Sequence, residues 1–209
     1  PLALPDFLAQ ANDNYLRQTI RLGRPGRVMP AFTQLSDAEV NAIVGYLRAL
    51  APAGMKPETA KAKPGDAARG AKLYGERCAS CHGAHGEGGH GTGVTFSRPR
   101  DLPILASALN NPGFLQSASD DFLKTVLVHG RRGTPMQPFL KQGLKERDLD
   151  DVVAYMRGFA AQPPPASAKI LESESAVILR ESPHSLEQTV EQLKTAFSAA
   201  NLRVIRAVP

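Results

Sequence analysis

The sequence contains two cysteines and no tryptophan among its 209 residues. A small secreted domain held by disulfides would need more cysteines, spread more widely along the chain. No run of about 18 apolar residues occurs, so we expect no membrane span in this chain. The formal net charge is +5, and the basic residues form no stripe with interleaved aromatics. The composition therefore argues against nucleic-acid binding and favours a globular protein of ordinary apolar content.

Two segments rich in proline and alanine divide the chain. Residues 51–64 (APAGMKPETAKAKP) show no apolar periodicity, and residues 162–168 (QPPPASA) favour stiff polyproline II. We therefore expect structured segments at residues 1–50, 65–161 and 169–209, joined by these two linkers.

Residues 13–32 and 120–139 are two copies of one pattern. At a constant offset of 107 positions the matching pairs are Gly23 and Gly130, Arg24 and Arg131, Gly26 and Gly133, Met29 and Met136, and Phe32 and Phe139. At an offset of 109 positions the pairs continue with Leu35 and Leu144, Val44 and Val153, Tyr46 and Tyr155, and Arg48 and Arg157. Matches this dense predict two copies of one domain.

The second copy alone has an additional N-terminal portion, residues 66–118, which holds both cysteines. We expect residues 1–50 to be the C-terminal half of such a domain, without its front half. The first residue is Pro1 rather than methionine, so we expect a piece of a longer protein. A signal peptide or membrane anchor would then belong to the part that is not included.

Capping residues and apolar spacing predict helices throughout both copies. Asp66 can cap a helix that runs toward the cysteines, and Asn12 and Ser119 occupy equivalent cap positions before the next helix. Ser36 to Glu39 form a capping box for a helix that ends near residue 50. Lys145 replaces the capping serine in the second copy, which predicts a weaker cap there.

The stretch Cys78-Ala-Ser-Cys81-His82 is the attachment pattern of c-type haem. One helical turn separates the two thiols, so both can form thioethers with the vinyl groups of one porphyrin. The next residue then directs its imidazole at the iron. Two alternatives to this interpretation are a structural zinc site and a redox dithiol. A structural zinc ion would need two further ligands, for which only His85 and His90 lie nearby, and a redox dithiol expects a βαβ setting.

Met136 lies in a proline-flanked loop and is the expected second axial ligand of the haem iron. A thioether suits low-spin haem iron and raises its reduction potential. A methionine is more often core filler, but Met29 recurs in the same Gly-Arg-x-Gly-x-x-Met frame. We therefore expect Met136 to ligate the haem held by His82, and Met29 to belong to a second, incomplete site. Met156 is expected in the core, and Met55 is expected to have no specific role.

Residues 66–160 resemble a complete class I cytochrome c domain, and residues 6–50 resemble the back half of a second one. The resemblance rests on the attachment pattern, the methionine loop, and the spacing of Gly70 and Tyr74 before the cysteines. It implies a mainly α fold in which the N-terminal helix crosses the C-terminal helix through a close glycine contact and an aromatic. The matching positions on the C-terminal helix are Val152 and Tyr155.

One feature departs from the family pattern. Many members have a Gly-Pro about a dozen residues after the haem histidine, and its carbonyl orients the imidazole. Here Gly93 is followed by Val94, so this role is unassigned, and Pro99 and Pro103 are candidates for it.

Other polar residues near these motifs have weaker signals. His85 and His90 lie in a glycine-rich loop and are expected to be solvated, whereas His129 is expected to pack within a loop. Arg24 and Arg131 recur beside the methionine loops. Because arginine suits carboxylate recognition, they are candidates for contacts with haem propionates, with a solvated face as the alternative.

Residues 169–209 change character and predict a short β-α-β segment. The strand-like run 176–179 precedes a capping box at Ser185 to Gln188, a helix that continues to Ala200, and a second strand over 202–208. This segment resembles the opening of a small bacterial α+β domain of unknown function. The resemblance is short and implies no activity.

The cytochrome resemblance implies electron transfer by covalently bound haem c, in a bacterial periplasmic protein that carries two haems at full length. Closed His/Met ligation favours a carrier over an enzyme. The alternatives are a haem subunit of a larger oxidoreductase, or a multihaem enzyme such as a peroxidase or a sulfur-compound dehydrogenase. The expected partners are redox proteins, and the basic charge favours acidic ones.

Overall fold

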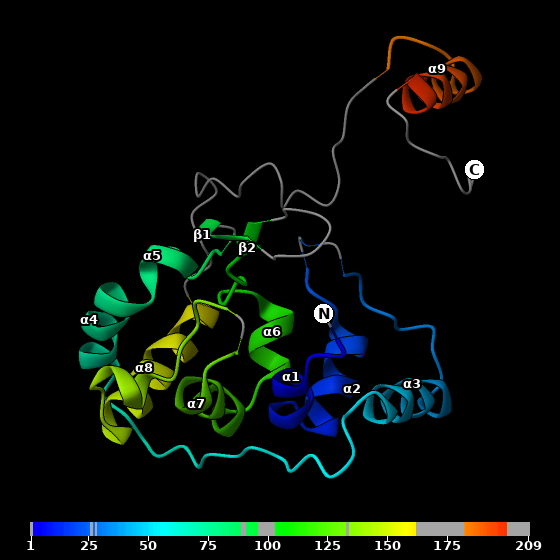
Figure 1. Cartoon of the computed structure of the whole chain (residues 1–209). Coiled ribbons are helices and arrows are strands. Elements are labelled where there is room, and N and C mark those ends of the chain that lie inside the picture. Colours follow the sequence, from blue (N-terminus) through cyan, green and yellow to red (C-terminus); the bar gives the residue numbers. More distant parts are fainter. Residues whose placement is uncertain are drawn as a thin grey trace. The chain divides into compact units, whose positions relative to one another are not determined.

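The computed structural model describes residues 2–25, 27, 29–88, 91–95, 103–132, 134–161 and 182–199. The chain divides into two compact units, residues 1–176 and 177–209. In Figure 1 the described part of the first unit runs from blue to yellow and is mainly helical, as predicted. In the second unit the structure describes the predicted helix, α9 (Leu186–Ala199). The polyproline segment and the two predicted C-terminal strands lie outside the described residues.

The first copy consists of three helices, α1 (Pro5–Gln10), α2 (Asp13–Leu22) and α3 (Asp37–Ala49). The predicted caps are confirmed: the Asn12 side chain accepts a hydrogen bond at the start of α2. Ser36 and Glu39 form the capping box of α3.

The second copy carries the same three helices behind a longer front portion. Its elements are α4 (Ala67–Arg77), α5 (Ala79–His82), β1 (Gly91–Thr95), β2 (Pro103–Leu105), α6 (Pro112–Ser117), α7 (Asp120–His129), the 3-10 helix η1 (Phe139–Gln142), α8 (Glu146–Gly158) and the 3-10 turn η2 (Phe159–Ala161). Asp66 and Ser119 cap α4 and α7 as predicted, whereas the Lys145 side chain makes no cap hydrogen bond. The expectation of helix throughout was wrong at β1 and β2, which pair antiparallel.

One arginine clamp recurs in both copies and shows that they fold alike. Arg48 of α3 donates to the backbone carbonyl groups of Leu8 and Ala11 and to the Asp13 carboxylate. Arg157 of α8 makes the corresponding three contacts in the second copy, with Leu115, Ala118 and Asp120. In each copy one guanidinium therefore ties the last helix to the junction between the two shorter helices.

The two copies pack against each other through equivalent residues. Tyr15 and Phe122, which occupy the same repeat position, stack with ring centroids 4.1 Å apart. Helix α2 of the first copy lies against α6 of the second, and the blue and green helices adjoin in Figure 1. A Cβ added at Gly113 would lie 2.3 Å from the Gly23 carbonyl oxygen, so the contact requires glycine. The sequence pattern did not predict this packing.

Arginine–aromatic contacts cross the same interface in both directions. The Arg24 guanidinium lies 5.6 Å from the Phe114 ring centroid, and that of Arg131 lies 5.5 Å from the Phe7 centroid. Phe7 and Phe114 are again equivalent positions of the repeat. The two copies therefore exchange the same contact, as the halves of a pseudo-twofold dimer would.

In the second copy, α4 crosses α8 at a close glycine contact, as the cytochrome resemblance implies. A Cβ at Gly70 would lie 2.0 Å from the Asp151 carbonyl oxygen. Tyr74 is buried and contacts the rings of Tyr155 and Phe159, with centroids 5.3 and 5.4 Å away. This cluster fixes the helix that leads into the two cysteines.

The segment between the copies, predicted as a linker, is held along the second copy by its backbone amides. Within residues 51–64 the amides of Ala60 and Ala62 donate to Thr125 and Asp121. Met55 packs against the hydrophobic core, contrary to the expectation that it has no specific role. The segment therefore fastens the two copies together rather than only spanning them.

Candidate functional site

One cavity of about 720 Å³ brings together all five residues predicted to hold haem. It is lined by Cys78, Cys81, His82, Met136 and Met29. Its apolar wall comes mainly from α7, η1 and α8, through Phe122, Leu123, Val126, Leu127, Phe139 and Met156. Met156, expected in the core, is buried and also faces this cavity.

The two cysteines lie at the junction of α4 and α5. Helix α4 ends at Cys78, whose amide donates to the Tyr74 carbonyl group 2.8 Å away. The single turn α5 then carries Cys81 and His82, and the Tyr74 hydroxyl donates to the carbonyl group of Gly83 over 2.9 Å. Gly83 has a φ of +81°, which lets the chain leave the helix directly after the histidine. The α4 cluster therefore sets the position of the whole attachment motif.

The His82 ring is oriented by one backbone group. Its Nδ1 lies 2.9 Å from the Ser107 carbonyl oxygen, so Nδ1 donates and Nε2 is left as the free ligand nitrogen. Burial lowers the pKa of His82 and favours the neutral ring that a metal ion requires. Ser107 performs the role for which the sequence offered Pro99 or Pro103, and that expectation was wrong. Pro103 instead begins β2, and Pro99 lies outside the described residues.

The thiols differ in exposure and are not joined by a disulfide. Cys78 is buried and Cys81 is half-buried. Burial raises the pKa of the Cys78 thiol to about 12, so it stays protonated at neutral pH. A zinc ion would require thiolates, which this environment disfavours at Cys78. Within the described ranges no group of three His, Cys, Asp or Glu side chains could hold a metal ion.

The two methionine loops have the same backbone geometry. Helices α2 and α7 end at Gly23 and Gly130, with φ values of +62° and +66°. The next amide in each copy donates to the methionine carbonyl group, over 2.7 Å to Met29 and 2.6 Å to Met136. A left-handed glycine followed by this bond turns each loop back toward the cavity. The recurrence predicted from sequence is therefore also a recurrence in structure.

The remaining polar residues differ in their surroundings. Arg24 and Arg131 both line the cavity, and both are half-buried rather than fully exposed. His85 is exposed, as expected, and His90 lies outside the described residues. His129 ends α7 instead of packing within a loop, and its Nδ1 lies 3.7 Å from a Glu58 carboxylate oxygen.

Two residues of the site were not found from the sequence. Ser107 has no distinguishing pattern around it, because the segment before it lacks apolar periodicity. Arg27 also lines the cavity, and its guanidinium donates to the Glu87 carbonyl group, just beyond the attachment motif. The equivalent residue of the second copy is Thr134. A comparison of the two copies could therefore have identified Arg27 as a position where they differ.

The cavity fits a haem group. It is mainly apolar, two thiols and a ligand nitrogen open onto it, and a thioether lies in the loop that closes it. The same donor set suits low-spin iron, since imidazole and thioether are both ligands that fill an axial position.

None of the helices that the structure describes is long and apolar enough to cross a membrane.

Comparisons with known proteins give one family match. Residues 67–160 match the family described as cytochrome c. No curated protein matches the chain. Among solved structures, one chain of the Kuenenia stuttgartiensis reducing HAO-like protein complex Kustc0457/Kustc0458 is similar, with 23% identity and a TM-score of 0.47. The similarity covers 71% of this chain and 72% of that chain.

Proposed function

Because residues 67–160 form a cytochrome c domain, which implies covalently bound haem c, we propose that the chain transfers single electrons through one haem attached at Cys78 and Cys81. His82 and Met136 are its axial ligands in this proposal. The observation that carries it is the convergence of both thiols, a histidine oriented through Nδ1 and a methionine loop on one apolar cavity.

The bound haem supplies the one-electron redox couple, and the chain supplies its ligation and surroundings. The Ser107 carbonyl group holds the His82 ring, which keeps its free nitrogen directed into the cavity. The Met136 thioether favours the reduced state and raises the potential. If His82 and Met136 held the iron on both sides, no position would be left for a substrate, which would favour a carrier over a peroxidase or a sulfur-compound dehydrogenase. A haem subunit of a larger oxidoreductase shares the same closed site and stays the alternative.

We further propose that Met29 ligates a second haem in the full-length protein. The first support is the shared loop geometry of Met29 and Met136. The second support is the outward face of α3, where Ile43, Tyr46 and Leu50 are 38%, 67% and 38% exposed. Their equivalents on α8 are Val152, Tyr155 and Phe159: Val152 is buried, and the rings of Tyr155 and Phe159 contact Tyr74 of the helix that leads into the cysteines. The α3 face therefore matches a surface that binds a helix of the α4 type.

The proposed setting is the bacterial periplasm, where c-type haem proteins of this family typically reside, with redox proteins as partners. The net charge of +5 favours acidic partners, whose association would weaken as salt screens the charges. Nucleic acids are not among the proposed partners, since the basic residues form no continuous stripe.

The test of axial ligation compares the wild-type holoprotein with Met136→Ala. The wild type is expected to show the absorption band of sulfur-to-ferric-iron ligation and to resist CO in the reduced state. Met136→Ala is expected to lose the band, bind CO and have a lower reduction potential, because the thioether is gone. Met156→Leu serves as the control, since it changes another cavity methionine without opening the axial position. A wild type that lacks the band, or binds CO readily, would overturn the carrier proposal.

The second haem is tested by haem content. The full-length gene product is expected to carry two covalent haems per polypeptide, and Met29→Ala is expected to remove one of two sulfur-ligation signals. A full-length protein with a single haem, or a Met29→Ala variant with unchanged spectra, would contradict the second site.

A further inference from the structure

The two arginines that follow the helix-ending glycines have different surroundings. The Arg24 guanidinium is satisfied by the protein. It donates to the Tyr15 hydroxyl over 3.1 Å, to Thr19 Oγ1 over 2.9 Å and to the Gly23 carbonyl group over 2.8 Å. Ser117 Oγ, across the interface between the copies, lies 3.4 Å away. Arg24 is therefore a structural tie within and between the copies.

Arg131 has lost every one of these partners. Phe122 stands where the first copy has the tyrosine, and Val126 stands where it has the threonine, so both hydroxyls are absent. The Gly130 carbonyl group accepts a hydrogen bond from Gln10 Nε2 over 2.9 Å instead. Among the described residues, the Arg131 guanidinium makes neither a hydrogen bond nor an ion pair. It lies over the Phe7 ring, 5.5 Å from the centroid, and interacts electrostatically with Asp6 and Tyr15.

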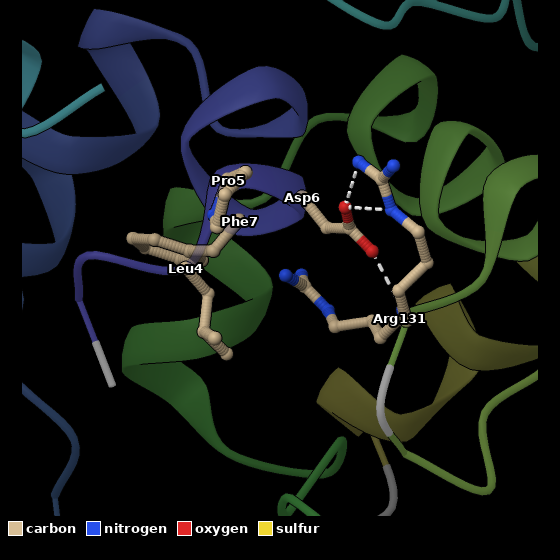
Figure 2. A pocket seen from close by; sticks show the side chains of 6 residues that line it. Leu4, Pro5, Asp6, Phe7 and Arg131 are labelled. Atoms are coloured by element: carbon tan, nitrogen blue, oxygen red, sulfur yellow. Dashed lines mark hydrogen bonds and ion pairs between the residues drawn. The ribbon is translucent and has the colours of Figure 1, made fainter. Parts of the chain in front are cut away.

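Arg131 is also half-buried. It lines both the main cavity and a smaller one of about 320 Å³, whose other lining residues are Leu4, Pro5, Asp6, Phe7 and Arg132. In Figure 2 none of the hydrogen bonds drawn to Asp6 comes from the Arg131 guanidinium, because Arg132 binds that carboxylate. Burial lowers the pKa of Arg131. Asp6 attracts this guanidinium but makes its hydrogen bonds and ion pair to Arg132. Leaving guanidinium N–H donors without acceptors in a partly buried position is costly, and arginine binds carboxylates through paired N–H donors.

We propose that Arg131 binds a propionate carboxylate of the haem attached at Cys78 and Cys81, and so acts as a positioning residue for that haem. The cavity places this guanidinium on the same lining as the attachment cysteines and Met136. Cytochrome c domains bind haem, and the propionates are the carboxylate groups that make haem anionic. The proposal rests on the first haem alone and is independent of the second.

The position also predicts an electrostatic role. A cation beside the haem stabilises the reduced form, because the ferric state carries one more positive charge. A carboxylate paired with arginine keeps a low pKa, whereas an unpaired and buried carboxylate has a raised one. Other charged or titratable groups that face this part of the site are Asp6, Tyr15, Arg24, Arg27, Arg77 and His82.

The test is the reduction potential of the holoprotein as a function of pH, for wild type, Arg131→Met, Arg131→Lys and Arg132→Met. Arg132 is the charge-matched control, since it is the next residue, is 76% exposed on its side chain and pairs with Asp6. At a fixed applied potential, Arg131→Met is expected to lower the ratio of reduced to oxidised protein about tenfold, or about 59 mV for one electron. Its potential is also expected to become pH-dependent above pH about 5, as the unpaired propionate titrates.

Arg131→Lys is expected to restore part of the potential, and Arg132→Met to follow the wild type. The buried Gln10 Oε1 has no donor among the described residues and is the rival partner for this guanidinium. If Arg131→Met lowers the melting temperature but leaves the potential and its pH profile unchanged, the role is structural and the proposal is overturned. An Arg132→Met shift equal to that of Arg131→Met would also overturn it, since any nearby charge would then suffice. Failure of haem attachment in the wild type would instead count against the proposed function.

Discussion

Helices α3 and α8 are the same helix in two settings, and the difference between them shows which part of the domain builds the proposed haem site. Their inward faces are equally buried, with Val40 and Val44 at 2% and 3% exposure and Leu149 and Val153 at 0% and 3%. Their outward faces differ, because only α8 is covered by α4. The inward face and the arginine clamp therefore need only the two preceding short helices. The outward face and a complete haem site need the helix that carries the cysteines.

The largest expected effect comes from removing the close approach of α4 to α8. Gly70→Ala would place a Cβ 2.0 Å from a backbone oxygen of α8, so the two helices must move apart. We expect a loss of about 3 kcal/mol in the free energy of unfolding, measured by denaturant titration of the holoprotein. Gly75→Ala, on the same helix, is the control, because nothing lies within 4 Å of its Cβ position. Its higher helix propensity should stabilise by up to about 1 kcal/mol. Equal losses in both variants would mean that the crossing is not tight.

The same crossing shows how far the sequence could be used for prediction. The spacing of Gly70 and Tyr74, read through the cytochrome resemblance, predicted the crossing correctly, because both residues act within a familiar pair of helices. Ser107 could not be found that way, since only its backbone carbonyl group is used and any residue provides one. The interface between the copies was missed for a different reason. Apolar periodicity shows that Tyr15 and Phe122 are buried, but it does not name the partner of either ring.

The second expected effect compares two tyrosines at one repeat position. Tyr155→Ala removes a ring that contacts Tyr74 and Phe159, so we expect a loss of about 2–3 kcal/mol in unfolding free energy. Tyr46→Ala removes a ring that is 67% exposed, and we expect a loss below about 0.5 kcal/mol in this chain. Both variants are measured by the same denaturant titration. In the full-length protein, where the proposed second haem helix covers α3, the Tyr46→Ala loss should approach that of Tyr155→Ala. If the loss of unfolding free energy in Tyr46→Ala stays small in the full-length protein, α3 is not covered by a haem helix in the way that α8 is covered by α4.

The third expected effect tests a set of contacts that the two copies share, those of Arg48 and Arg157. Arg48→Lys and Arg157→Lys each replace a guanidinium that serves two carbonyl groups and one carboxylate with a single ammonium. Lysine cannot reproduce this planar set of donors, so we expect each variant to lose about 1–2 kcal/mol. The melting temperatures of the two variants should fall by similar amounts. A clearly larger fall in melting temperature for Arg157→Lys would mean that the Arg48 contacts stabilise the first copy less than the Arg157 contacts stabilise the second. The same set of contacts would then not give the two copies the same stability.

The smallest expected effect concerns how the copies are joined, and it depends on pH. The Asp6 carboxylate of the first copy accepts hydrogen bonds from Arg132 of the second, and this partner holds the pKa of Asp6 below its usual value. Because the folded pKa is the lower one, the bond contributes stability above the unfolded pKa of about 3.9, and this is lost as pH falls through the folded value. Arg132 is largely exposed, so solvent screening limits the contribution to below about 1 kcal/mol. The melting temperatures of wild type and Asp6→Asn should therefore differ at pH about 7 and converge toward pH about 3. A difference that persists at the lowest pH would assign the loss to packing at the interface rather than to the ion pair.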